Sequence, residues 1–187
     1  CDMDVGRAER CAADFSLASV YGDLAVMLAD AALDFVDIAT QPASHRALVE
    51  QVAAHGTAVI CQKPLAPSLE DGQAMVAACA LAGVPFMVHE NFRWQTPMRA
   101  LKEAAADIGE LFFAQVSFRS AFDVYSNQPY LATDPRFIIF DLGVHALDLA
   151  RFFMGDVLSI DCHAQRVNPL IRAEDVATML LRMESGS

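Results

Sequence analysis

The chain has 187 residues, of which 55% are hydrophobic and 20% charged, and its formal net charge is −11 at pH 7. This composition is typical of a globular protein with one good core or two small ones, and it excludes a disordered chain. The excess of acidic residues argues against a nucleic-acid surface and against adhesion to an anionic membrane.

The first half of the sequence alternates short apolar runs with amphipathic segments that end at glycines. Residues 1–4 are interpreted as the end of a strand. Further strands are predicted over residues 35–39, 57–61 and 84–89. Helices are predicted over residues 7–15, 24–29, 44–54 and 68–82. Short strands between such helices indicate an α/β fold, with a Rossmann-like parallel sheet covered on both faces.

The second half has a different pattern, which predicts an α+β domain with a largely antiparallel sheet. Helices are expected over residues 96–106 and 142–154, with a long loop over residues 123–138. Alternating polar and apolar residues predict a strand over residues 111–122, and residues 157–167 and 175–183 are interpreted as two strands of a sheet. We place the domain boundary near residues 91–97, which gives one domain over 1–93 and a second over 94–187.

Two short motifs carry the chemistry. Lys63 follows the apolar run 58–61, and Asp141 and His145 stand four residues apart at the head of a predicted helix, so both lie on one helical face. Together they are what proton transfer from a hydroxyl needs, because imidazole is a base, a carboxylate holds it and an ammonium favours the oxyanion. Taken singly, each has a structural alternative, a solvated lysine at a strand end or an acidic helix cap followed by a histidine.

Four segments in order resemble the glucose–fructose oxidoreductase/inositol dehydrogenase (Gfo/Idh/MocA) family of NAD(P)-dependent oxidoreductases, and the resemblance spans essentially the whole chain. They are residues 34–45, 61–66, 91–94 and 141–148. Gln62 stands where the family usually has glutamate, which removes a negative charge beside Lys63. The family opens with a strand and a Gly-rich turn, and no segment of this sequence fits that turn. Roughly the first 30 residues of a βαβ unit would have to precede Cys1. We therefore expect the chain to be part of a longer protein.

The resemblance implies that residues 1–93 are a partial dinucleotide-binding domain and that residues 94–187 are a partial substrate and oligomerisation domain. It also implies residues that contact the dinucleotide. Asp2 is expected to bind the adenosine ribose and to favour NAD over NADP. Asp4 is the alternative residue for this role. Arg7 is close enough that NADP is not excluded as the cofactor. The other expected cofactor contacts lie in turns after strands or near the domain boundary: Thr40, Gln41, Pro42, His45, Gln62, Lys63, Pro64 and Arg93. For His45, a purely structural role is the alternative.

The resemblance also implies the catalytic residues. His145 is the general base, Asp141 orients the substrate and supports the imidazolium, and Lys63 stabilises the developing negative charge. Candidate substrate contacts are Trp94, Arg119, Tyr125, Tyr130 and Arg136. For Trp94, packing between the two domains is the alternative. Asp148 and the remaining histidines are interpreted as structural, and no metal site is expected.

The function implied is hydride transfer between NAD, with NADP not excluded, and a secondary alcohol of a sugar, cyclitol or related polyol. The alternatives are an NAD-dependent glycosidase, which would not accumulate NADH, and a non-catalytic dinucleotide-binding regulator, which would not need the lysine and the Asp/His pair. We expect a homo-oligomer formed through the sheet of the second domain. Five scattered cysteines without a CxxC pair favour a cytoplasmic location, and no apolar run reaches transmembrane length.

Overall fold

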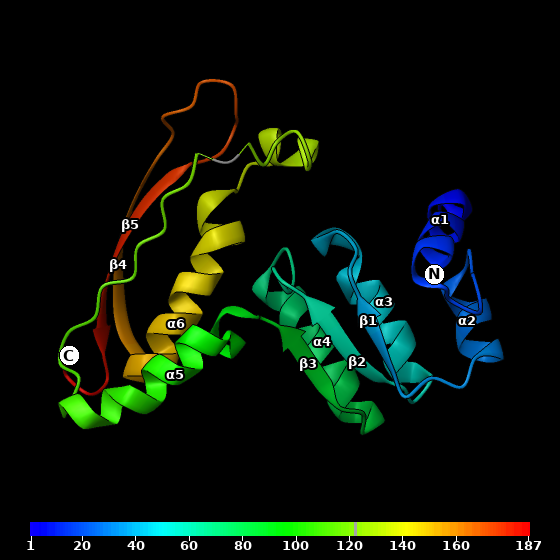
Figure 1. Cartoon of the computed structure of the whole chain (residues 1–187), viewed down its shortest axis with the longest axis horizontal. Helices are drawn as coiled ribbons and strands as arrows, with labels where there is room; N and C mark the ends of the chain where they lie inside the picture. Colours follow the sequence, from blue (N-terminus) through cyan, green and yellow to red (C-terminus); the bar gives the residue numbers. More distant parts are fainter. Residues whose placement is uncertain (122) are drawn as a thin grey trace. The chain divides into compact units, whose positions relative to one another are not determined.

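The computed structural model describes residues 1–121 and 123–187, which form two compact units, Cys1–His89 and Glu90–Ser187 (Figure 1). The first unit contains helices α1 (Val5–Phe15), α2 (Leu24–Asp30), α3 (Pro42–Ala54) and α4 (Leu69–Ala82). Its strands are β1 (Phe35–Ile38), β2 (Ala58–Gln62) and β3 (Phe86–His89). These bounds agree with the predicted elements to within two residues, apart from residues 1–4.

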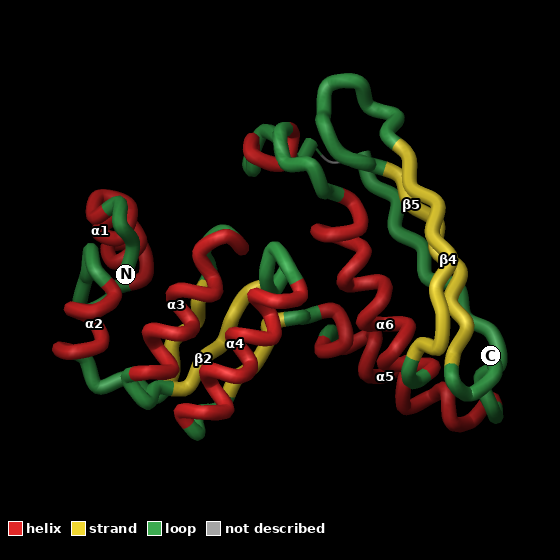
Figure 2. Tube along the Cα trace, turned by 180° about the vertical axis from the view of Figure 1, so that it is seen from behind, coloured by secondary structure: helices red, strands yellow, loops and turns green. Residues whose placement is uncertain are grey.

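The strands of the first unit form a parallel sheet in the order β1-β2-β3, and α3 and α4 lie side by side on one face of it (Figure 2). Alternate residues of β1 and β2 point into the core beneath these helices, which explains why Val36, Ile38, Val59 and Cys61 are buried. The expectation that both faces are covered is wrong for the described residues. On the exposed face, Phe35 of β1 keeps 53% of its surface accessible.

Residues 1–4 do not form a strand in the structure. The Asp2 N–H donates to the carbonyl of Tyr21, and Asp4 is the N-cap of α1, where its carboxylate accepts a hydrogen bond from the N–H of Arg7. An N-cap residue has extended backbone angles, here φ −83° and ψ 91° for Asp4. The residue before a helix is therefore locally similar to a residue at the end of a strand.

The second unit combines helical turns with an antiparallel pair of strands. Its longer elements are α5 (Thr96–Ala104), α6 (Val144–Met154), β4 (Val157–Gln165) and β5 (Val176–Met183). Short 3₁₀ turns cover Phe92–Trp94 (η1), Ala105–Ile108 and Pro129–Ala132, and a π-helical turn, Ile139–Gly143, leads directly into α6. β4 and β5 pair with each other. The parallel sheet of the first unit and this antiparallel pair confirm the expected fold class.

The strand predicted over residues 111–122 is wrong for the part that the structure describes. Residues 111–121 belong to no β-ladder, and Phe122 lies outside the described residues. The alternation of polar and apolar side chains is compatible with an extended segment, but a strand also needs a neighbour whose backbone groups pair with its own. Phe112 and Phe118 of this segment are exposed.

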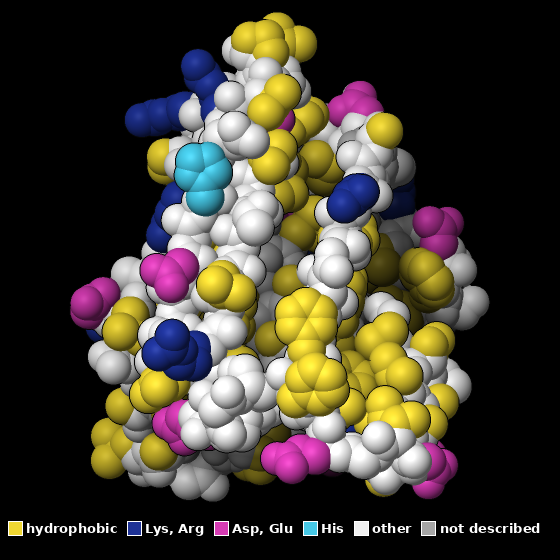
Figure 3. All heavy atoms as spheres, turned by 90° about the vertical axis from the view of Figure 1, so that its left-hand side faces the viewer, with side chains coloured by type: hydrophobic (Ala, Val, Ile, Leu, Met, Phe, Trp, Pro, Cys, Tyr) yellow, Lys and Arg dark blue, Asp and Glu magenta, His cyan; other side chains and the backbone are white. Residues whose placement is uncertain are grey.

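The long loop expected over residues 123–138 has its own small core. Leu131 and Phe137 are buried against Ile171 and Ala173, which follow β4. Elsewhere many hydrophobic side chains are exposed, and Figure 3 shows such side chains among acidic and basic ones. Within the described residues, no helix is both long and apolar enough to cross a bilayer.

Candidate active site

In the first unit, the expected cofactor residues follow the carboxyl ends of two neighbouring strands. Thr40, Gln41 and Pro42 come after β1, and Lys63 and Pro64 come after β2. Because β1 and β2 are parallel and hydrogen-bonded, the two turns lie at the same edge of the sheet. Ligands of open α/β sheets bind at this edge. The polar turns therefore fit a bound dinucleotide, and Thr40 and Gln41 are exposed there while Lys63 is partly exposed.

His45 joins these two turns. Its Nδ1 lies 3.0 Å from the carbonyl oxygen of Leu65, and its Nε2 lies 3.0 Å from that of Thr40. The ring is completely buried. Both nitrogens thus face backbone carbonyls, and the direct cofactor contact expected for His45 is not what the structure shows. Its position instead fixes the spacing between the turn after β1 and the loop after β2.

Gln62, which replaces the family's usual glutamate, is bound to a neighbouring strand. Its Nε2 lies 2.5 Å from Nδ1 of His89, the residue paired with it across β2 and β3. An amide N–H can donate to an unprotonated ring nitrogen, whereas a glutamate at this position would need a proton on the ring. Gln62 is therefore matched to His89.

At the amino end of the chain, Asp2 and Arg7 form an exposed ion pair at 3.7 Å. Oδ1 of Asp2 also accepts a hydrogen bond from the N–H of Asp4. Of the two carboxylates that could bind a ribose, that of Asp4 is already used to cap α1, and that of Asp2 lies next to a cation.

In the second unit, His145 lies on α6 with a buried imidazole ring. Its Nδ1 is 2.6 Å from Oε1 of Glu90, and its ring stacks on that of Phe92 with centroids 3.9 Å apart and an angle of 8° between the planes. The same Oε1 accepts a hydrogen bond from the N–H of Phe92 at 3.1 Å. One nitrogen and one face of the imidazole are thus held by the segment just after β3.

Sequence reasoning missed Glu90. The carboxylate expected to support the imidazolium was Asp141, but the one bonded to Nδ1 is that of Glu90, which is 55 residues away in the chain. Asp141 lies in the π-helical turn before α6, where its N–H donates to the carbonyl of Phe137 at 2.7 Å. The one sequence feature that could have indicated Glu90 is its position directly before the segment 91–94.

Arg93, expected to contact the cofactor, is bound to Asp148. Its Nε donates to Oδ2 at 2.7 Å and its Nη2 donates to Oδ1, a two-point pairing with the carboxylate. The hydrogen bond to Asp148 raises the pKa of Arg93. Its Cζ also lies 5.4 Å from the ring centre of Phe152. The same segment that holds His145 is therefore fixed to α6 a second time.

The expected substrate contacts belong to several segments of the second unit. Trp94 is 59% exposed, with the guanidinium of Arg99 5.3 Å from its ring. Tyr130 donates to Gln128 at 2.7 Å, and burial raises the pKa of its phenol. The others are Arg119, which is exposed, Tyr125, whose ring packs against Phe137, and Arg136, which lies 4.4 Å from the ring of Phe140.

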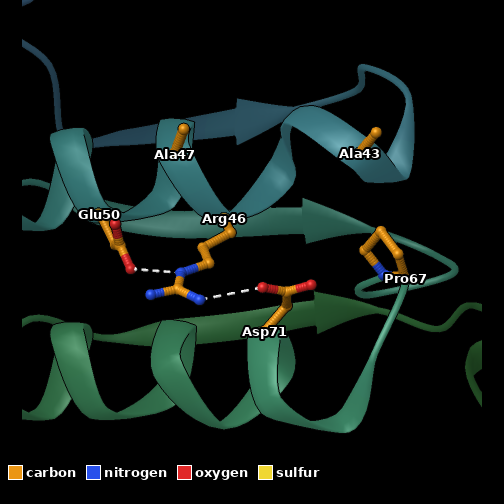
Figure 4. Close-up of a pocket in the computed structure, with 6 residues that line it drawn as sticks. All are labelled: Ala43, Arg46, Ala47, Glu50, Pro67 and Asp71. Atoms are coloured by element: carbon orange, nitrogen blue, oxygen red, sulfur yellow. Dashed lines mark hydrogen bonds and ion pairs between the residues drawn. The ribbon is translucent and has the colours of Figure 1, made fainter.

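A groove between α3 and α4 is lined by residues that bind one another (Figure 4). In it, Nε of Arg46 donates to Glu50 at 2.8 Å and Nη1 donates to Asp71 at 3.0 Å. This network ties the two helices together and leaves the guanidinium between two carboxylates. Within residues 1–121 and 123–187, no group of three or more His, Cys, Asp and Glu side chains could hold a metal ion.

Comparison with known proteins identifies relatives along the entire chain. Residues 1–90 match the model of an oxidoreductase family with an NAD-binding Rossmann fold, and residues 98–187 match the C-terminal domain of the GFO/IDH/MocA proteins. The chain is 54% identical to a D-apiose dehydrogenase of Rhizobium rhizogenes, covering 100% of this chain and 55% of the relative. It is 55% identical to a D-apiose dehydrogenase of Paraburkholderia graminis, covering 100% and 50%.

A solved structure is similar over the same region. It is the crystal structure of an oxidoreductase from Agrobacterium radiobacter in complex with NAD+, L-tartaric acid and magnesium, with 54% identity and a TM-score of 0.96. The match covers 100% of this chain and 55% of that one. The chain thus spans about half the length of the relatives that it matches.

Proposed function

The chain belongs to the Gfo/Idh/MocA family of oxidoreductases, and we propose that its protein transfers a hydride between NAD(P) and a secondary alcohol of a sugar, cyclitol or related polyol. The observation that carries the proposal is His145, whose buried ring has one nitrogen held by a carboxylate and is thereby set up as a base. Relatives 54–55% identical over the whole chain are named D-apiose dehydrogenases, so D-apiose is the first substrate to test.

In this proposal the turns after β1 and β2 hold the dinucleotide, with Thr40, Gln41 and Pro42 on one turn and Lys63 and Pro64 on the other. Their place at the carboxyl edge of a parallel sheet fits such a ligand. When bound, the nicotinamide supplies the hydride acceptor. The protein's share is proton transfer. The imidazole of His145 takes the proton of the substrate hydroxyl, and the ammonium of Lys63 stabilises the oxyanion.

Two further features belong to the proposal. We propose NAD as the preferred dinucleotide, supported by the carboxylate of Asp2, with Arg7 beside it as the feature that could admit NADP. We also propose a cytoplasmic homo-oligomer formed through the sheet of the second unit. The exposed Val176 and Leu180, which share one face of β5, support such an interface.

The test uses the full-length gene product and the absorbance of NADH. Wild-type protein should reduce NAD+ when D-apiose, or another aldose or cyclitol, is added. His145→Ala should lower turnover by about 10²–10⁴-fold, the usual contribution of a general base, while the dissociation constant of NAD+ stays the same. His55→Ala, which changes an exposed histidine at the end of α3, is the matched control.

Three outcomes would contradict the proposal. Full activity of His145→Ala would mean that another group is the base. Cleavage of a glycoside without net NADH would indicate the glycosidase alternative. Binding of NAD+ without turnover of any polyol would indicate the regulator.

A further inference from the structure

We propose that Glu90 is the positioning residue of His145. It fixes the rotation of the ring and the position of its proton, so that Nδ1 carries the proton and Nε2 is left to exchange one with a substrate hydroxyl. This inference rests on the proposed function, because it assigns a role to Glu90 within the same proton transfer.

The geometry of Glu90 allows one arrangement of the ring proton. A carboxylate can only accept, so the 2.6 Å contact between its Oε1 and Nδ1 requires the proton on Nδ1. A neutral imidazole has a single N–H, and Nε2 then has the lone pair that a base needs. When the substrate hydroxyl gives its proton to Nε2, the Nδ1 proton stays between the ring and Glu90. The resulting imidazolium then lies beside a negative charge.

The buried carboxylate of Glu90 is not explained by the stability of the fold alone. Its side chain is only 14% exposed, and its Oε2 is buried without a hydrogen-bond partner among the described residues. A buried acceptor that makes no hydrogen bond destabilises a fold, and native proteins contain few of them. A neutral side chain at position 90 would avoid burying the charge. The charge of Glu90 acts on the nearby guanidinium of Arg93, which is already paired with Asp148, and its Oε1 contacts Nδ1 of His145 directly.

The surroundings hold the pair in this arrangement. The Phe92 N–H donates to the same Oε1 that receives the Nδ1 proton, which limits the rotation of the carboxylate. The Phe92 ring stacks almost parallel to the imidazole and limits its tilt. The next residue, Arg93, binds Asp148, one turn after His145 on α6. Both partners of the hydrogen bond are therefore fixed by contacts outside it.

The experiment compares Glu90→Gln and Glu90→Leu with wild type in the full-length gene product. Glutamine keeps an oxygen that can accept the Nδ1 proton but removes the charge, whereas leucine removes both. We expect kcat for sugar oxidation to fall from wild type to Glu90→Gln to Glu90→Leu. The loss in Glu90→Leu should be at least about tenfold and no larger than the about 10²–10⁴-fold loss for His145→Ala. KM should change little. Glu103→Gln, on the exposed side of α5, is the matched control.

A second readout does not depend on turnover. In protein labelled with ¹⁵N-histidine, NMR shifts of His145 should show a protonated Nδ1 and an unprotonated Nε2 in wild type and in Glu90→Gln. Glu90→Leu should lose this preference. A wild-type ring protonated at Nε2, or a Glu90→Leu protein with unchanged kcat, would overturn the role of Glu90. If wild type oxidises no polyol, the proposed function fails, and the NMR result still decides whether Glu90 fixes the proton of His145.

Discussion

The pair Arg93–Asp148 gives the most direct test of how the second unit is held together. We expect that Arg93→Ala and Asp148→Ala each lower the free energy of unfolding, and that the double variant loses less than the sum of the two. The reason is that each single change leaves a partly buried charge without its partner. Both residues belong to the second unit, and their bond fixes the turn η1 to α6.

The size of the coupling follows from the geometry. The guanidinium makes two hydrogen bonds to one carboxylate, and hydrogen bonds to charged groups contribute about 1.5–3 kcal/mol each when fully formed in a protein. The side chains of Arg93 and Asp148 are 31% and 21% exposed, so water replaces part of what is lost. We expect a coupling free energy of about 1–2 kcal/mol, above the 0.2–1 kcal/mol range typical of exposed pairs.

The assay is a double-mutant cycle by urea unfolding, with the midpoint and slope of each transition measured for the full-length gene product. The chain provides a control with the same chemistry. Arg151 and Asp156 also form an ion pair, but their side chains are 60% and 63% exposed. Their cycle should give a coupling near the lower end of the range for exposed pairs. Equal coupling in the two cycles would refute the argument, because the partial burial of Arg93 and Asp148 would then have no energetic consequence.

Two other predictions concern the first unit. Burial raises the pKa of the Cys61 thiol to about 12, and it raises that of Cys79 as well, so both stay protonated and should resist iodoacetamide in native protein near neutral pH. Mapping of labelled peptides should find exposed Cys11 modified instead, and rapid labelling of Cys61 would contradict the buried position of β2. Ser68→Ala removes the hydroxyl that accepts the Asp71 N–H at 3.1 Å, and it should lower the free energy of unfolding by about 1 kcal/mol in urea. An unchanged unfolding midpoint would show that this cap contributes nothing.

The elements that sequence predicted correctly are those specified by nearby residues. Helix α4 is an example, because Ser68 caps its start and Gly83, with φ 68°, ends it. The parallel strands were found from short apolar runs between such helices. The segment 111–121 shows the limit of this reasoning. Its alternating side chains indicate which residues would share a face of a strand. A β-ladder also needs a neighbouring strand, and the local sequence does not specify that neighbour.

The candidate site divides in the same way. Lys63 and His145 could be named from motifs, since each occupies a fixed place after a strand or within a helix. The burial of His45 could not, because it depends on the carbonyl of Leu65, which is 20 residues further along the chain. Its place in the first turn of α3 is equally compatible with an exposed ring. Whether Lys63 and His145 act on one substrate stays a prediction, and activity measurements on variants of both will test it.

The two contacts between the segment after β3 and α6 have the same separation in sequence. Glu90 binds His145 and Arg93 binds Asp148, each across 55 residues. A step of three residues in the segment therefore matches a step of three residues, close to one turn, along the helix. One alignment of the segment on α6 satisfies both pairs, and a shift of either element by one residue would break both. Phe92 lies between Glu90 and Arg93 in sequence, and its ring stacks on the imidazole. The ion pair that we expect to stabilise the second unit thus joins the same two elements as the contact between Glu90 and His145, and this links the fold of the unit to the proposed proton transfer.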